Sequence, residues 1–143
     1  MTGYSDIALP QKLGIKPGAT VIAINEPANY RKLLGKIPDG AHFSNRVTRG
    51  AEFIHFFTTR RRDLKKKLSI LHERLAQGGV IWISWPKKSA GVPSDVTEDV
   101  IRAVALPLGL VDIKVCAVDE TWSGLKLMIR REERRLKNDK ATS

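Results

Sequence analysis

The feature that most constrains the fold is a leucine-faced helix pattern followed almost directly by an apolar strand. Leucines recur at positions i, i+4, i+7 and i+11 from Leu64 to Leu75, which places them on one face of a helix. Gly78 and Gly79 are predicted to end this helix, and VIWISW (80–85) then reads as a strand of the kind buried inside parallel sheets. The helix has one apolar face, and the strand that follows must be buried on both faces. Together they predict a layered α/β domain.

The segment before this helix repeats the alternation of strand and helix patterns. KPG introduces a β-rich run at Ala19–Asn25, and ANYRKLLGKI (28–37) reads as a short helix closed by glycine and proline. A brief strand is indicated near Ala41–Ser44, and EFIHFFTT (52–59) reads as a buried aromatic strand. Strands and helices are therefore expected to alternate along the first half of the chain.

The segment after VIWISW predicts a second helix and a closing hairpin. Asp95 with Glu98 three residues later fits a capping box, and Pro107 is expected to stop the helix. The residues expected to face inward from it are Val100, Ile101, Val104 and Ala105. Two runs of alternating apolar and polar residues, 111–115 and 125–129, predict a terminal antiparallel pair. Together these patterns predict a Rossmann-like, three-layer α/β sandwich with a mostly parallel sheet and a C-terminal antiparallel hairpin.

Length and composition favour one intracellular domain. The chain of 143 residues is expected to form a single domain at 1–131, with a charged tail at 132–143 that is frayed or disordered. No apolar run approaches the roughly 20 residues of a membrane helix, and the N-terminus lacks a signal-peptide layout. The single cysteine, Cys116, excludes an internal disulfide, and the three histidines lack metal-ligand spacing. We therefore expect a cytoplasmic protein without a bound metal or membrane contact.

The chain carries a marked excess of positive charge. It has 25 lysines and arginines against 15 acidic residues, a net charge of +10. Residues 1–129 hold 19 of the basic and 12 of the acidic residues, so +7 remains without the tail. A basic surface concentrates anions around the protein. The expected partners are a small anionic ligand, an acidic protein or, without sequence preference, nucleic acid.

Particular stretches of the sequence resemble known families. LGIKPGATVIAIN (13–25) resembles the lead-in to the first strand of the class I methyltransferase fold, and LAQGGVIWIS (75–84) resembles the Gly-Gly entry to its fifth strand. The longer span Tyr4–Arg131 resembles a family of small bacterial proteins known only as a domain of unknown function. LGIKPG, WPKKSAG and DVTEDVIRAVALPLGLVDIKVCAVDETWSGLKL carry that second resemblance. It implies relatives and a fold, and it brings no activity to this chain.

The chain departs from methyltransferases where their cofactor would bind. In that fold the first strand runs into an acidic, glycine-rich loop, because glycine lets the backbone approach the cofactor closely. The corresponding stretch here, Asn25–Tyr30, contains no glycine. Residues 41–50 offer no acidic side chain for a ribose, and the short segment before 52–59 indicates that one α/β unit is missing. We therefore expect no cofactor, S-adenosylmethionine included.

The candidate site is the rim formed by the carboxyl ends of the strands, where open α/β sheets bind ligands. It includes the turn from Asp119 only if the strand from Leu110 runs parallel to its predecessor. The candidate ligand-binding residues are Trp85, Lys87, Lys88, Ser89, Arg60, Arg61, Asp119, Glu120, Thr121 and Trp122. The basic groups would bind an anion and the indoles would stack on a planar ligand. No residue is assigned a catalytic role.

A purely structural interpretation of the same residues stays open. Arg60–Arg62 and the lysines 87–88 also fit solvated loops, and acidic residues at 95–99 fit the capping of a helix. Trp82 is predicted to be a core residue on the opposite sheet face from Trp85.

Three functional hypotheses follow. The first is a binding module that uses a basic rim to hold a small anion or an acidic partner. The second is an enzyme of unknown substrate that relies on Asp119, Glu120 and the two rim lysines. The third is a protein associated non-specifically with nucleic acid.

Overall fold

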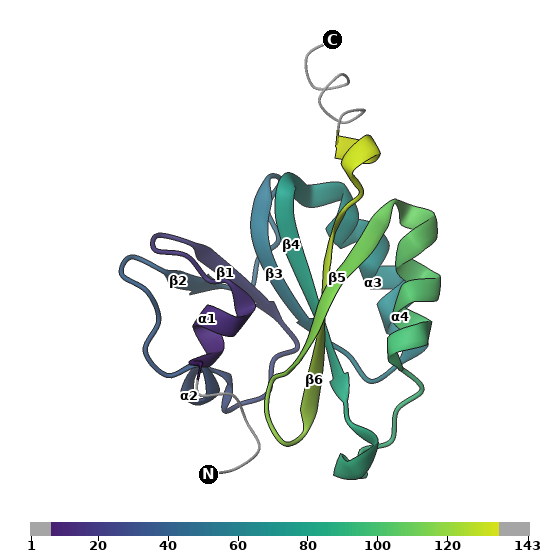
Figure 1. The fold of residues 1–143 in the computed structure, drawn as a ribbon, viewed down its shortest axis with the longest axis horizontal. Helices are drawn as coiled ribbons and strands as arrows, with labels where there is room; N and C mark the ends of the chain where they lie inside the picture. Colours follow the sequence, from purple (N-terminus) through teal and green to yellow (C-terminus); the bar gives the residue numbers. More distant parts are fainter. Residues whose placement is uncertain (1–6, 135–143) are drawn as a thin grey trace.

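The structure, a computed structural model, describes residues 7–134 and contains a six-stranded sheet with helices on both faces (Figure 1). The helices are α1 (Leu9–Leu13), α2 (Tyr30–Leu34), α3 (Arg61–Arg74) and α4 (Glu98–Ala105), with short 3-10 turns η1 (Lys88–Ala90) and η2 (Leu106–Leu108). The strands are β1 (Thr20–Ile24), β2 (His42–Ser44), β3 (Ala51–Phe57), β4 (Leu75–Pro86), β5 (Leu110–Ala117) and β6 (Trp122–Ile129). The predicted α/β class is confirmed.

The strand order is β2-β1-β3-β4-β6-β5. β1 pairs in parallel with β2 and β3, and β3 pairs in parallel with β4. β6 runs antiparallel to both β4 and β5, so β5 points the same way as β4. The predicted antiparallel hairpin is therefore confirmed, and the carboxyl ends of β1, β3, β4 and β5 meet at one edge of the sheet.

The face of the sheet under α3 and α4 carries the larger core. Three leucines of α3, at 64, 68 and 71, are fully buried there, as the leucine pattern predicts. From α4, Ile101 and Ala105 are buried and Val100 and Val104 pack against the same cluster. The two helices lie side by side over this face (Figure 1).

The opposite face carries a smaller core under α1 and α2. Leu13 and Tyr30 cover Phe53, Phe57 and Trp82 there. The Trp82 indole is fully buried and donates from Nε1 to the carbonyl oxygen of Leu13 at 2.9 Å. The predictions that Trp82 is a core residue and faces away from Trp85 are confirmed.

The boundary between α3 and β4 differs from the prediction. The helix ends at Arg74, and Gly78 and Gly79 lie inside β4 instead of stopping the helix. A β-carbon on Gly79 would lie 2.8 Å from the Leu75 side chain and 2.9 Å from the carbonyl oxygen of Ala51. Gly79 is therefore needed where β4 approaches β3 closely, which is a role that a helix-stop interpretation misses.

The capping of α4 also differs from the prediction. Thr97, not Asp95, is the N-cap residue, and its hydroxyl accepts from the amide of Val100 at 3.2 Å. Asp95 instead accepts from the backbone amide of Arg61 at 2.6 Å, at the start of α3. The predicted capping box is wrong. The spacing of Asp95 and Glu98 fits a capping box, but the Asp95 carboxylate accepts at the start of α3, a helix that is distant in sequence from α4.

The β2–β3 connection is short. Residues 45–50 join the two strands without a helix, as expected for a chain that lacks one α/β unit. The predicted tail, 132–143, lies mostly outside the described residues. Within residues 7–134, no helix is long and apolar enough to cross a membrane.

Candidate ligand-binding rim

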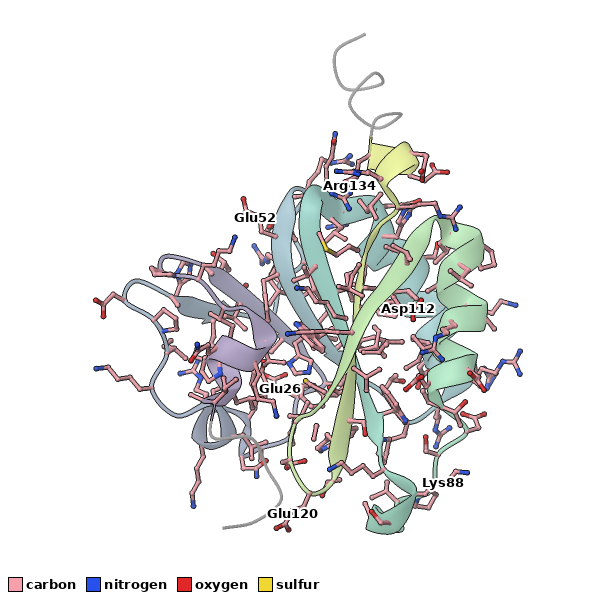
Figure 2. The ribbon with its side chains drawn as sticks, in the orientation of Figure 1. Glu26, Glu52, Lys88, Asp112, Glu120 and Arg134 are labelled. Carbon is pink, nitrogen blue, oxygen red and sulfur yellow. The ribbon has the colours of Figure 1, made fainter. Side chains whose placement is uncertain are left out.

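The rim at the strand carboxyl ends is formed by four connections. They are the β1–α2 loop, the β3–α3 loop, the β4–α4 connection with η1, and the β5–β6 turn. Lys88 and Glu120 lie at this end of the molecule, whereas Glu52 and Arg134 lie at the other end (Figure 2). The topology therefore brings the predicted rim segments to one edge, as the parallel strand directions require.

The β5–β6 turn is held in shape by Asp119 and attached to the end of β4. One carboxylate oxygen of Asp119 accepts from the amides of Thr121 at 2.9 Å and Trp122 at 2.7 Å. The carbonyl oxygen of Thr121 accepts from the amide of Lys87 at 2.8 Å. Asp119 thus builds the turn with one of its carboxylate oxygens.

A cavity of about 540 Å³ opens at this rim, between α1, α2 and the β5–β6 turn. Its apolar lining comes from Ile7, Leu9, Leu33 and Val118. Its polar lining comes from Lys12, Asn29, Asp119, Glu120 and Thr121. Apolar walls with a few converging polar groups are typical of small-molecule sites. Of the predicted residues, the cavity includes Asp119, Glu120 and Thr121.

The predicted arginines and lysines occupy other parts of the rim. Arg60 is the residue before α3, and Arg61 lines a separate cavity of about 420 Å³ between α3 and α4. Lys88 begins the exposed turn η1, and Lys87 is half-buried beside the β5–β6 turn. The four predicted cations therefore lie outside the lining of the rim cavity.

The two predicted stacking tryptophans lie on opposite faces of the sheet. Trp85 is 9% exposed and packs in the core under α3 and α4, so it supports the fold and is not available to stack on a ligand. This corrects its assignment as a ligand-binding residue. Trp122 is half-buried on the other face, with its ring edge-on to Phe57 at a centroid distance of 5.0 Å.

A buried polar chain, which the sequence analysis missed, lies beneath the rim. The Tyr30 hydroxyl is 2.8 Å from Nδ1 of His55, and Nε2 of His55 is 2.7 Å from the Ser84 hydroxyl. His55 and Ser84 are fully buried, and the imidazole stacks on Phe57. A polar residue buried in an apolar strand, such as His55, needs a hydrogen-bond partner. That requirement is the signal in the sequence that could have revealed the buried polar network.

Burial determines the protonation states of His55 and Tyr30 in this buried network. Burial lowers the pKa of His55 from 6.5 to about 3, so the imidazole is neutral at physiological pH. Burial, with the nearby Glu26 carboxylate, raises the pKa of the Tyr30 hydroxyl. A neutral imidazole has one donor and one acceptor nitrogen, which suits a hydroxyl on each side. The three groups therefore satisfy one another without a net charge.

Other reactive groups do not gather into a site. Among residues 7–134, no three histidine, cysteine, aspartate or glutamate side chains are grouped to hold a metal ion. Cys116 is half-buried, and burial raises the pKa of its thiol.

The fold is shared with solved methyltransferases. A candidate type 11 methyltransferase from Sulfolobus solfataricus aligns with a TM-score of 0.61 and 16% identity, over 85% of this chain and 89% of that one. A SAM-dependent methyltransferase from Aquifex aeolicus aligns with a TM-score of 0.57 and 17% identity, over 84% of this chain and 89% of that one. This is a methyltransferase-like fold.

At such low identity the likeness establishes the fold alone. No protein-family model and no curated protein matches the sequence. The resemblance to a small bacterial family therefore stays a prediction.

The residues at the β1–α2 loop do not fit a methyltransferase cofactor cradle. Asn25 adopts a positive φ of 57°, so a turn that favours glycine is made here by a residue with a side chain. Pro27 follows, and β2 is succeeded by Asn45 and Arg46 where an acidic residue would hold a ribose. The sheet is methyltransferase-like, and the β1–α2 loop and the end of β2 do not offer the glycines and the carboxylate that such a cofactor site uses.

Proposed function

We propose that this chain is a small-molecule-binding domain whose rim cavity holds an anionic ligand. The observation that carries the proposal is the cavity of about 540 Å³, which joins apolar walls to a lysine ammonium at the ligand-binding edge of the sheet. The ligand is expected to be a metabolite with a phosphate or carboxylate group, and an acidic side chain of a partner protein would present the same chemistry.

Lys12 supplies the anion contact. Its ammonium donates one hydrogen bond to the carbonyl oxygen of Ala117 at 2.9 Å, which fixes its position on β5. An ammonium has three donors, so the remaining two can bind a ligand. The Asn29 amide lines the same cavity, and the exposed Lys88 and Arg60 on neighbouring loops raise the local concentration of anions.

The acidic side chains on one side of the cavity indicate which chemical groups the ligand carries. Glu120 and the second carboxylate oxygen of Asp119 are acceptors at the side formed by the β5–β6 turn. Acceptors there favour a ligand that carries hydroxyl or amino groups in addition to its anionic group. A phosphorylated polyol or an amino acid derivative has both features.

Thermal-shift and calorimetric screening of phosphorylated and carboxylated metabolites tests the proposal. We expect a ligand that stabilises the wild type and whose affinity falls about tenfold or more in Lys12→Gln, because a charge-assisted hydrogen bond is lost. Lys87→Ala/Lys88→Ala should weaken binding less, through the local field. Lys36→Gln, which changes a lysine that does not line the cavity, is the matched control. Equal affinity in Lys12→Gln and Lys36→Gln would refute the rim site.

The second candidate is an enzyme, which the fold shared with methyltransferases favours. Glu120 would be its general base, with Lys87 and Lys88 beside the turn. Calorimetry with S-adenosylmethionine distinguishes the two candidates. We expect no binding at physiological concentration, because the β1–α2 loop lacks glycine. A micromolar dissociation constant would favour the enzyme.

A further inference from the structure

A row of lysines crosses the part of the sheet that no helix covers. On the α1/α2 face, helices cover β1 and β3, whereas β6 and β5 have none over them among the residues described (Figure 1). Lys126 of β6 lies on this face, in register with Trp82 of the core beneath α1. Lys114 of β5 is the cross-strand partner of Lys126. Cross-strand partners hold their β-carbons about 5 Å apart, so the two lysine side chains leave the sheet side by side.

The row extends in both directions from this pair. Lys16, in the segment before β1, lines one cavity with Lys126. In the other direction, Cys116 lies two residues along β5 from Lys114, and the Lys12 ammonium donates to the carbonyl oxygen of the next residue, Ala117, at 2.9 Å. The order across the face is therefore Lys16, Lys126, Lys114 and Lys12, from the amino edge of β4 to the rim cavity.

Among residues 7–134, none of the four lysines forms an ion pair with a carboxylate, and the acidic residues near them only line the same cavities. Burial, with the nearby ammonium groups of Lys114 and Lys16, lowers the pKa of Lys126. Glu52 is the acidic residue in the same cavity lining, against Lys16 and Lys126.

The groove at the amino end of the row combines open backbone with apolar side chains. It has a volume of about 480 Å³ and lies over the first half of β4. Its floor includes Gly78 and Gly79, and a β-carbon on Gly78 would meet nothing within 4 Å. Val80 and Met128 add half-buried apolar surface. Open backbone and apolar side chains between lysines can accept a base while the ammonium groups bind phosphates.

We propose that the lysine row, Lys16, Lys126, Lys114 and Lys12, binds the backbone of single-stranded nucleic acid across the open face of β6 and β5. An extended row of positive charges matches successive phosphates better than a single anion. The row joins two hollows of about 480 and 540 Å³, which admit single nucleotides. A duplex is a stiff rod with paired bases, and it cannot place its bases in hollows of this size. This proposal does not depend on a metabolite in the rim cavity.

Fluorescence anisotropy with a labelled single strand of about 12 nucleotides tests the proposal. The test variant is Lys16→Gln/Lys114→Gln/Lys126→Gln, which leaves Lys12 and the rim cavity intact. The matched control is Lys65→Gln/Lys66→Gln/Lys67→Gln on α3, which removes the same charge from the opposite face of the sheet. Glutamine retains helix propensity and solubility, so both variants should melt within about 2 °C of the wild type.

We expect the row variant to bind the strand at least about tenfold more weakly at roughly 100 mM salt, and the α3 variant within about threefold of the wild type. The slope of log affinity against log salt should fall by about 2 in the row variant alone, since each phosphate contact on a single strand contributes about 0.7. Equal losses in both variants would mean that net charge alone drives binding, and the proposal would fail.

Two competitors complete the test. A duplex of the same length that displaces the strand at lower concentration would overturn the single-strand assignment. Millimolar inorganic phosphate that displaces it fully would show a site for one small anion. Absence of strand binding by the wild type at about 50 mM salt would also refute the proposal. Loss of strand binding in the row variant, with metabolite binding in the rim cavity retained, separates this site from the rim cavity.

Discussion

On the covered face of the sheet, α3 packs against β4 and α4 packs against β5 (Figure 1). On the partly covered face, α1 and α2 lie over β1 and β3 and not over β6 and β5. The covered face is almost wholly apolar. The partly covered face contains the Tyr30–His55–Ser84 chain, the half-buried Trp122 and the lysine row. One face therefore provides most of the apolar burial, and the other retains the polar and charged groups from which both proposed sites are built.

The largest effects should come from truncating the core on each face. Leu68→Ala under α3 is expected to cost about 2–5 kcal/mol of unfolding free energy, and Trp82→Ala about 3–5 kcal/mol. Chemical denaturation of both variants measures how much each face contributes. Trp82→Phe retains most of the apolar area and loses the bond to Leu13, so it should cost less than Trp82→Ala. If Trp82→Ala costs under about 1 kcal/mol, the α1/α2 core does not stabilise the fold.

The buried polar chain should give the next largest effect. His55→Leu leaves the hydroxyls of Tyr30 and Ser84 without their shared partner, at an expected cost of about 2–4 kcal/mol. Ser84→Ala removes one hydroxyl and only one of the two bonds, so it should cost less. Denaturation midpoints measured at pH 8, where an unfolded histidine is also neutral, isolate this contribution. Equal midpoints for wild type and His55→Leu would contradict it.

The same histidine makes the stability depend on pH. In the folded protein, burial lowers the pKa of His55 to about 3. The ordinary value of 6.5 applies in the unfolded chain, where the imidazole is not buried. Between these values the unfolded chain binds a proton that the folded chain does not, so stability falls as the pH falls from about 6.5 towards 3. The slope from this group reaches at most about 1.4 kcal/mol per pH unit. His55→Leu should remove it, and an unchanged difference between pH 7 and 5 would count against a neutral buried imidazole.

The helix caps on the covered face should give smaller effects. Thr97→Ala removes the N-cap acceptor of α4, and Asp95→Ala removes the acceptor at the start of α3, each at an expected cost of about 1 kcal/mol. Asp95→Asn keeps an acceptor and is the control. Hydrogen exchange shows which helix each variant destabilises. If Asp95→Ala destabilises only the amides of α4, then Asp95 caps α4, as the capping box predicts, and does not bond to α3.

The covered face was the easier face to predict from sequence. The spacing of Leu64, Leu68 and Leu71 and the alternation at 125–129 report local burial, so the helix and the hairpin could be placed correctly. The strand directions then followed from right-handed crossovers, and with them the location of the rim. The start of β4 was missed because Gly79 is required by contact with β3, which local patterns do not record.

The partly covered face could not be predicted because its groups converge only in three dimensions. Tyr30, His55 and Ser84 come from α2, β3 and β4, and no spacing in the sequence connects them. Lys16 and Lys126 are also far apart along the chain, and the cross-strand register with Lys114 decides which lysines meet. The prediction that Trp85 and Trp122 share a site failed for a related reason, since the β4–β6 register places Trp122 opposite Pro86 and hence on the other face.

The smallest predicted effect concerns the open part of that face, where Lys114→Glu should stabilise the protein. Like charges directly opposite on neighbouring strands are destabilising, and opposite charges are favourable. Exchanging the Lys114–Lys126 pair for a Glu–Lys pair should therefore raise the unfolding free energy by about 0.2–0.5 kcal/mol at low salt, and the gain should shrink as salt screens it. Lys65→Glu on α3 makes the same charge change away from the row and controls for net charge.

The same Lys114→Glu protein should bind a single strand more weakly than the Lys65→Glu protein. A gain in stability coupled to a loss of binding would show that the repulsion is retained for the ligand, whereas a loss of stability would mean that Lys114 and Lys126 do not repel each other on this face.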